Sequence, residues 1–321
     1  MSRAVCRGNA AHTLGGNAGT ERISPWESRG NKGTRKGRMT MTATTTARRA
    51  NLYTQAWYAW QANRQEALTS PHNYLAPLST TWVAEGETKT IKEFPGIWSV
   101  KNDTLTYEPI VGSSVTNEGK PLDEPISFTP TAFGEQSLGY IDLGDVRAEV
   151  NSQTDRNEHD VHRFWIRIKD PKAQPRANFV GIDHFDPDPA WSLPAKFIPA
   201  GDAELDIHDS VVTTVLQSYK VLGTVEFEYQ GSSYSLIVSN VFGHAYIFFS
   251  DGTSDSQTAG IGRILELSAA DVLGLDHIDF NYAFNYPCSF SLFCTCPIPS
   301  KRNHLPFAVT AGEKTPHEYQ Y

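Results

Sequence analysis

The stretch RFWIRIKD at residues 163–170 alternates large apolar side chains with charged ones. In an extended chain this alternation places the three apolar residues Phe164, Ile166 and Ile168 on one face. A period of two residues is typical of a β-strand, and the Asp170-Pro171 pair ends it. The stretch therefore predicts that the C-terminal half of the chain opens with a β-strand.

The chain that follows is a series of short apolar runs, each bounded by Gly, Asp or Pro. Many short strands at modest spacing are typical of a closed or sandwiched antiparallel sheet. We therefore expect residues 161–321 to form the larger β domain, an antiparallel barrel or sandwich. The runs that we expect to be strands are residues 179–182, 191–194, 221–229, 234–241, 245–249 and 264–267.

Residues 78–160 have the same strand-and-turn pattern and predict a separate, small β-sandwich-like unit. Their order of strands loosely resembles the forkhead-associated sandwich, a fold that often binds phosphothreonine peptides. Such domains use a Gly-Arg pair, a Ser followed by His, and an Asn-Gly pair. This chain has Gly86-Glu87 and Asn117-Glu118-Gly119 instead. Phosphopeptide binding is therefore not expected.

An aromatic stripe precedes the β region, since Tyr53, Trp57 and Trp60 recur at helical spacing and Leu68 closes the stripe. This spacing predicts a helix over residues 52–68 that Pro71 ends. We assign residues 49–77 to this helix and a linker.

Residues 1–48 are rich in Gly, Ser, Thr, Asn and Arg, and predict a disordered basic tail. Two explanations stay open: an upstream misread of a chain that starts at Met39 or Met41, or a functional basic or transit-like tail. Residues 1–40 contain eight basic and two acidic side chains, a charge of +6, which leaves −14 for the rest of a chain with net charge −8.

These properties exclude several classes of function. An acidic folded body repels phosphate backbones, so we expect no nucleic-acid partner. No run approaches the roughly 20 apolar residues of a membrane helix, and no secretory signal is present, so we expect a soluble cytoplasmic protein without a membrane partner. The sequence contains no phosphate-binding loop or dinucleotide fingerprint, and we expect no cofactor. The oligomeric state is left open.

Seven short motifs occur in order near the C-terminus. They are FSDGT (249–253), GIGR (260–263), DFN (279–281), NYPCSF (285–290), CPIP (296–299), NHL (303–305) and AGEK (311–314). Through them the chain from about Arg163 to Lys314 resembles the domain of unknown function 1684 family, and the helix with Trp60 and Arg64 resembles the entry helix of that family. The chain departs from the family at Gly260-Ile261, where an aromatic residue is expected, and at the additional Cys294. The resemblance implies a fold and no activity.

Seven polar residues of these motifs are candidate ligand-binding residues: Asp251, Thr253, Arg263, Asp279, Asn281, Asn285 and Glu313. An Asp-Gly-Thr turn can also satisfy its own backbone amides, which would make Asp251 and Thr253 structural. The two asparagines can tie loop carbonyls together. The functional interpretation instead has the carboxylates converge with Arg263, whose planar guanidinium can hold a carboxylate or phosphate.

Metal binding has only weak candidates, namely His184 and Asp186 in an acidic loop and Cys288 and Cys296 in the cysteine-rich segment. The Cys294-Thr-Cys296 spacing is too tight for a structural zinc site. We therefore predict no metal, and small buried thiols.

Three functions from different classes remain, and catalytic residues stay unknown. First, the protein could bind a small molecule or peptide without catalysis, in a β pocket lined by Trp165, Phe248 and Tyr282 and anchored by Arg263. Second, it could be a hydrolase-like enzyme that uses Asp251, Asp279 or Glu313 with Arg263. Third, it could be a structural partner protein with an exposed apolar patch.

Overall fold

The computed structural model describes residues 35–132, 134–154, 161–201, 204–268 and 272–317. Among the described residues strands predominate over helices, which confirms the predicted mainly β class with an N-terminal helix. The first 34 residues, to which most of the predicted basic tail belongs, lie outside the described residues.

The N-terminal helix α1 extends over Arg35–Leu68 and is longer than expected. The prediction of a tail as far as residue 48 is therefore wrong for residues 35–48. The error arose because we predicted disorder from composition alone. The stretch from Gly37 to the end of the helix contains no further glycine and no proline, so nothing in it interrupts a helix.

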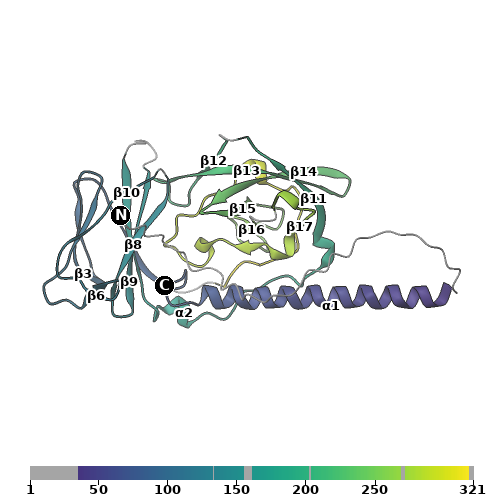
Figure 1. Ribbon diagram of the computed structural model, residues 1–321, viewed down its shortest axis with the longest axis horizontal. Coiled ribbons are helices and arrows are strands. Elements are labelled where there is room, and N and C mark those ends of the chain that lie inside the picture. Colours follow the sequence, from purple (N-terminus) through teal and green to yellow (C-terminus); the bar gives the residue numbers. More distant parts are fainter. Residues whose placement is uncertain (1–34, 133, 155–160, 202–203, 269–271, 318–321) are drawn as a thin grey trace. The chain divides into compact units, whose positions relative to one another are not determined.

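The first β body consists of two antiparallel sheets around one core (Figure 1). Among the described residues, a six-stranded sheet has the order β1 (Pro77–Val83), β10 (His162–Lys169), β9 (Val146–Thr154), β8 (Gln136–Leu143), β5 (Val115–Asn117) and β6 (Lys120–Pro121). A four-stranded sheet has the order β2 (Thr88–Ile91), β3 (Phe94–Val100), β4 (Leu105–Glu108) and β7 (Ile126–Phe128).

We expected the strand at residues 163–170 to open the C-terminal domain, but it belongs to the first β body. As β10 it pairs with β1 on one side and β9 on the other, and its apolar residues Phe164, Ile166 and Ile168 are part of the core of the first β body. The alternation predicted the strand and its buried face correctly. It could not predict the partner, because β1 lies about 80 residues earlier in the chain and pairing at that distance leaves no local signal.

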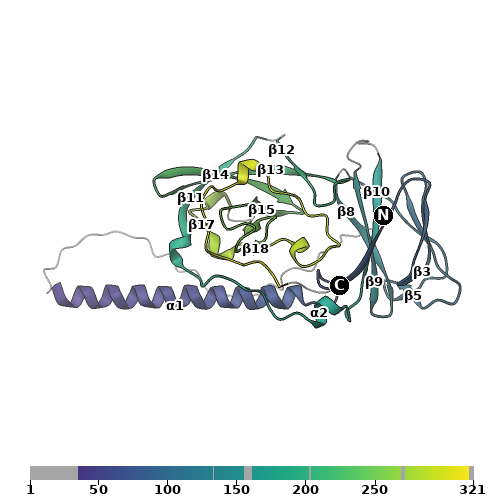
Figure 2. The same cartoon turned by 180° about the vertical axis from the view of Figure 1, so that it is seen from behind.

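The second β body is an eight-stranded antiparallel sheet with a half-barrel curl, seen from both sides in Figures 1 and 2. Within the described part of the chain its order is β17 (His277–Asp279), β11 (Ser192–Pro199), β13 (Leu216–Tyr229), β14 (Ser232–Val241), β15 (His244–Phe249), β16 (Arg263–Leu267) and β18 (Phe284–Asn285), and β12 (Leu205–Asp209) pairs with β13. Short helical turns join these strands: α2 (Gln174–Ala177), η1 (Pro189–Trp191), η2 (Val272–Gly274), η3 (Phe280–Tyr282), η4 (Pro287–Ser289) and η5 (Lys301–Asn303).

The two faces of this sheet bury different clusters, because successive side chains of a strand point to opposite sides. On β15, Ala245, Ile247 and Phe249 belong to the main core, whereas Tyr246 and Phe248 belong to a second cluster. This second cluster includes the cysteines of residues 288–296. We call it the thiol face, formed by Tyr219, Val241, Tyr246, Phe248, Ile261, Ile264, Phe284, Tyr286, Cys288, Cys294 and Cys296.

A membrane-spanning helix would need both length and apolar character. No helix of the described residues has enough of both to cross a membrane.

Candidate functional site

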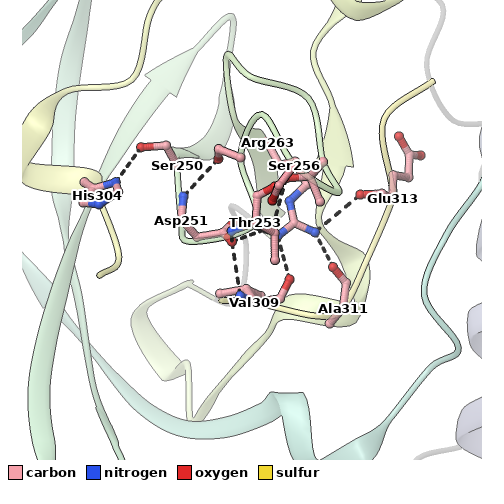
Figure 3. Close-up of polar contacts among 11 residues, drawn as sticks. Ser250, Asp251, Thr253, Ser256, Arg263, His304, Val309, Ala311 and Glu313 are labelled. Atoms are coloured by element: carbon pink, nitrogen blue, oxygen red, sulfur yellow. Dashed lines mark hydrogen bonds and ion pairs between the residues drawn. The ribbon is translucent and has the colours of Figure 1, made fainter. Parts of the chain in front are cut away.

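Arg263, at the start of β16, is a fully buried charged side chain, with 0% of its surface exposed. Figure 3 shows its guanidinium surrounded by acceptors from the C-terminal segment and from the turn at residues 251–253. Nη2 donates to Asp251 Oδ2 at 2.7 Å and to the Val309 carbonyl at 2.9 Å. Nη1 donates to the carbonyls of Ala311 and, at 3.4 Å, Glu313. Both terminal nitrogens are therefore occupied by the protein itself.

Asp251 completes this arrangement with its second carboxylate oxygen. Oδ1 accepts hydrogen bonds from the Thr253 amide at 2.7 Å, the Thr253 hydroxyl at 2.6 Å and the Val309 amide at 3.1 Å. The Thr253 hydroxyl also lies 2.9 Å from the Thr258 hydroxyl. The Asp-Gly-Thr turn thus satisfies its own amides, as the structural interpretation of this motif predicts.

The buried pair of Arg263 and Asp251 is a structural brace between the sheet and the C-terminal segment. Burial lowers the pKa of Arg263 while Asp251 opposes that shift, and an arginine stays protonated in either case. A ligand at the terminal nitrogens of Arg263 would have to displace Asp251 or a backbone carbonyl from a site closed to solvent, whereas Nε is buried and bonds to nothing among the described residues. That Arg263 anchors a ligand stays a prediction.

Glu313 forms a second ion pair near this brace. The carboxylate of Glu313 is fully buried and accepts hydrogen bonds from Arg64 Nε at 2.8 Å and from the backbone amide of Asn285 at 2.7 Å. Arg64 keeps 18% of its side chain exposed and lies over the ring of Phe284, with 4.5 Å between the guanidinium carbon and the ring centroid. The last turns of α1 are thereby attached to the second β body.

Asp279 and Asn281 form a loop tie of their own. Asn281 Oδ1 accepts from the Asp188 amide at 2.9 Å, and its Nδ2 donates to the Asp188 carbonyl at 2.8 Å. Asp279 Oδ1 caps the turn by accepting a hydrogen bond from the backbone amide of Asn281 at 3.0 Å. Asn285 acts in the same way, since its Nδ2 donates to the Lys314 carbonyl at 2.7 Å. The tie role that we expected of both asparagines agrees with these contacts.

The thiol face holds a buried polar group of a different kind. Tyr286 is 0% exposed and its ring stacks on Phe248, with 5.6 Å between centroids and an interplanar angle of 23°. Among the residues that the structure describes, nothing bonds to its hydroxyl. Burial raises the pKa of Tyr286 well above that of a free tyrosine, so the hydroxyl keeps its proton and is a donor.

The comparisons with known proteins bear on this C-terminal region. Residues 177–314 match the family described as "Protein of unknown function (DUF1684)". This confirms the predicted resemblance for residues 177–314, which we call the DUF1684 segment; residues 163–176 and the helix with Trp60 and Arg64 lie outside the match. A solved structure similar to part of the chain is the solution NMR structure of an uncharacterized protein from Haloarcula marismortui, with 29% identity over 44% of this chain and 79% of that chain, at a TM-score of 0.37. No curated protein matches the chain.

The candidate residues of the DUF1684 segment fall into separate groups. Asp251, Thr253 and Arg263 meet in the brace, Glu313 and Asn285 meet beside it, and Asp279 with Asn281 ties a different loop. The three carboxylates each have their own partners and do not share one reaction centre. A hydrolase that uses them together therefore has no support here.

The weak metal candidates are also not assembled. In the described ranges of the chain, no three His, Cys, Asp or Glu side chains are grouped so that they could hold a metal ion. His184 forms a backbone bridge with Glu313, and its Nδ1 lies 3.0 Å from the Phe185 carbonyl. Cys288 and Cys296 lie together on the thiol face, far along the chain from His184 and Asp186.

The pocket expected between Trp165, Phe248 and Tyr282 is not formed by these three residues. Trp165 packs against Trp82 in the first β body, with 4.9 Å between ring centroids, while Phe248 lies on the thiol face and Tyr282 packs against the main core. Sequence reasoning missed Tyr286, whose only signal was its place inside the NYPCSF motif.

Proposed function

We propose that the DUF1684 segment binds a small molecule without catalysis, and that the ligand lies on the thiol face with Tyr286 as its polar anchor. The observation that carries this proposal is the Tyr286 hydroxyl, a fully buried donor to which nothing among the described residues bonds. A buried hydroxyl without a partner costs about 1–3 kcal/mol, and an internal ligand with an acceptor removes that cost. Buried polar groups that the protein leaves unsatisfied call for a specific explanation.

The surroundings of Tyr286 indicate the class of ligand. Phe248, Tyr246 and Tyr219 supply aromatic surface, and the thiols of Cys288 and Cys296 are soft, weakly polar neighbours. Such a surface suits a flat, largely apolar molecule with one hydrogen-bond acceptor.

Access to this face would pass through the segment that covers it. Residues 286–300 contain a single helical turn, and the amide of Cys288 donates to the Cys296 sulfur at 3.3 Å. Sulfur is a weak acceptor, so this contact opens at low cost. Entry of a ligand would also have to open stronger hydrogen bonds that hold this segment, among them the Val211 amide to the Cys296 carbonyl at 3.0 Å and the Gln217 side chain to the Thr295 carbonyl at 2.8 Å.

The location that we propose is the cytoplasm, where reducing conditions keep cysteines as thiols; Cys288, Cys294 and Cys296 are unpaired in the structure. The net charge of −8 supports a small-molecule partner over a nucleic acid.

The test is a thermal-shift screen of small aromatic molecules, followed by Tyr286→Phe. For a compound at about 100 times its Kd, binding stabilises the fold by about 2.7 kcal/mol. Loss of the anchoring hydrogen bond should weaken binding roughly tenfold and reduce this stabilisation to about 1.4 kcal/mol, while the unliganded melting temperature does not fall.

Tyr107→Phe is the matched control, because the Tyr107 hydroxyl donates to the Pro95 carbonyl at 2.6 Å in the first β body. It should lower the unliganded melting temperature and leave the ligand-induced shift intact. A screen without hits, or hits whose shift survives Tyr286→Phe, would refute the proposal.

A further inference from the structure

The six-stranded sheet of the first β body has one apolar face and one charged face. Phe164, Ile166 and Ile168 of β10 lie in the core of that body, so the alternate residues Arg167 and Lys169 lie on the opposite face. These two cations are only 8% and 6% exposed. Two positive charges are therefore buried two residues apart on one strand, which is costly unless each of them is balanced.

One carboxylate serves both cations. Glu149 of β9 lies directly opposite Arg167, and its two oxygens accept from Arg167 Nη1 at 3.0 Å and from Lys169 Nζ at 2.9 Å. No other acidic side chain of the described residues forms an ion pair with either cation. These three side chains together carry one excess positive charge.

The acidic residue Glu135, which precedes β8 of the same sheet, does not pair with these cations. Its carboxylate accepts from Gln217 Nε2 at 2.7 Å. Burial raises the pKa of Glu135, although the hydrogen bond from Gln217 opposes the shift. Burial also lowers the pKa of Lys169 even though Glu149 opposes that shift, as expected where two cations share one carboxylate.

The same face has hydrogen-bond donors to spare. Arg167 Nε donates to the Phe293 carbonyl at 2.8 Å, but nothing among the described residues bonds to Nη2, which solvent can reach. Thr80 of β1 lies directly opposite Arg167, and its hydroxyl also lacks a described partner. Directly opposite residues share one face and have Cβ atoms about 4.5–5.5 Å apart, so this hydroxyl lies beside the arginine.

From this arrangement we propose that Arg167, Lys169 and Thr80 form a binding site for a small oxyanion, either a carboxylate or a phosphate group. A guanidinium and an ammonium hold such a group by charge-assisted hydrogen bonds, and the hydroxyl supplies a neutral donor. The bound anion balances the second cation, which Glu149 leaves without a charge of its own.

The position of this site limits the size of its ligand. The side chain of Glu149 is 24% exposed, so a small anion can approach the two cations past its carboxylate. The net charge of −8 repels long polyanions, which favours a small ligand. The site shares no residue with the thiol face and does not depend on a ligand at Tyr286.

The test is a titration of the full chain with inorganic phosphate and, separately, with acetate. Ionic strength is held constant with sodium chloride, and binding is followed by thermal shift and isothermal titration calorimetry. We expect a saturable rise in melting temperature and one bound anion per chain with at least one of the two probes. The probe that binds more tightly distinguishes a phosphate ligand from a carboxylate.

Two variants connect this binding to the proposed residues. Lys169→Gln keeps a donor for Glu149 but removes one charge, and it should weaken binding about tenfold. Thr80→Val keeps the shape of the side chain and should weaken binding roughly two- to tenfold; it also serves as the second test if Lys169→Gln does not fold. Thermal unfolding without added anion checks that each variant is folded.

Lys89→Gln is the matched control, because Lys89 belongs to the same β body and pairs with Glu87 at 3.3 Å with both side chains exposed. It should leave the affinity unchanged, as should Tyr286→Phe. The proposal is overturned if neither probe has a saturable effect beyond that of chloride, if binding survives both Lys169→Gln and Thr80→Val, or if Lys89→Gln weakens binding as much as Lys169→Gln does.

Discussion

The buried brace between Asp251 and Arg263 gives the sharpest prediction about the fold. In Asp251→Asn the amide has nearly the shape of the carboxylate and still accepts from Thr253 and Val309 through one oxygen. The other oxygen becomes an NH₂ group that faces Arg263 Nη2, so a donor meets a donor across 2.7 Å. The substitution therefore leaves a buried guanidinium without its counter-charge.

The expected cost follows from the burial of both partners, 0% and 1% of whose side chains are exposed. Removal of one partner of such a pair costs about 3–5 kcal/mol of unfolding free energy, because the remaining charge cannot reach water. Arg263→Met should cost at least as much, since it also leaves the carbonyls of Val309 and Ala311 without a donor. The double variant should cost less than the sum, by about 1–3 kcal/mol, because no lone charge remains.

Urea denaturation followed by tryptophan fluorescence measures these free energies. The exposed pair of Arg302 and Glu204, 3.5 Å apart, is the control. The same cycle with Arg302→Met and Glu204→Gln should change stability by no more than about 1 kcal/mol and show no coupling. If Asp251→Asn costs as little as the control pair, the brace is not structural and Arg263 is again a candidate ligand anchor.

Three further predictions follow from single contacts. Tyr286→Phe should leave the unfolding free energy of the unliganded protein unchanged or raise it by up to about 1–3 kcal/mol in urea titrations, because it removes a buried donor without a described partner; a loss would show a missed partner. Gly262→Ala should lower the melting temperature, because φ is +98° there and a methyl group would collide with the Phe249 carbonyl; an unchanged value would contradict this contact. Glu149 should make the free energy of unfolding fall in acid. Burial raises the pKa of Glu149, but the charges of Lys169 and Arg167 outweigh burial, and the pKa is lowered. The contribution of Glu149 to stability is therefore full above the unfolded pKa of about 4.3 and is lost as the pH falls through the folded pKa. Glu149→Gln should flatten the pH dependence in that window, and an unchanged slope would exclude this contribution.

Local chemistry explains what the sequence could predict. The alternation in RFWIRIKD places Phe164, Ile166 and Ile168 in a core, and the structure has them there. The Asp-Gly-Thr turn forms from the side chains of its own residues, and the loop tie of Asn281 needs only its amide group. In each case the deciding contact is either within a few residues or dictated by the side-chain type.

The remaining features depend on contacts between distant parts of the chain. Whether the terminal nitrogens of Arg263 have acceptors within the protein depends on the positions of the carbonyls of Val309 and Ala311, which are more than 45 residues away in the chain. We underestimated the length of helix α1, because its first residues have a composition typical of a disordered tail and yet contain few helix-breaking residues. Tyr286 could not be distinguished from any core aromatic, because an unsatisfied hydroxyl is a property of its neighbours and not of its own motif.

Two contacts of the DUF1684 segment depend on arginines from outside residues 177–314. Glu313 is fully buried and is neutralised by Arg64 of α1, and the carbonyl of Phe293 accepts from Arg167 Nε of β10 at 2.8 Å. A buried carboxylate without a cation is costly. The segment that matches the family therefore contains the buried carboxylate, whereas the cation that stabilises it comes from α1, outside the match.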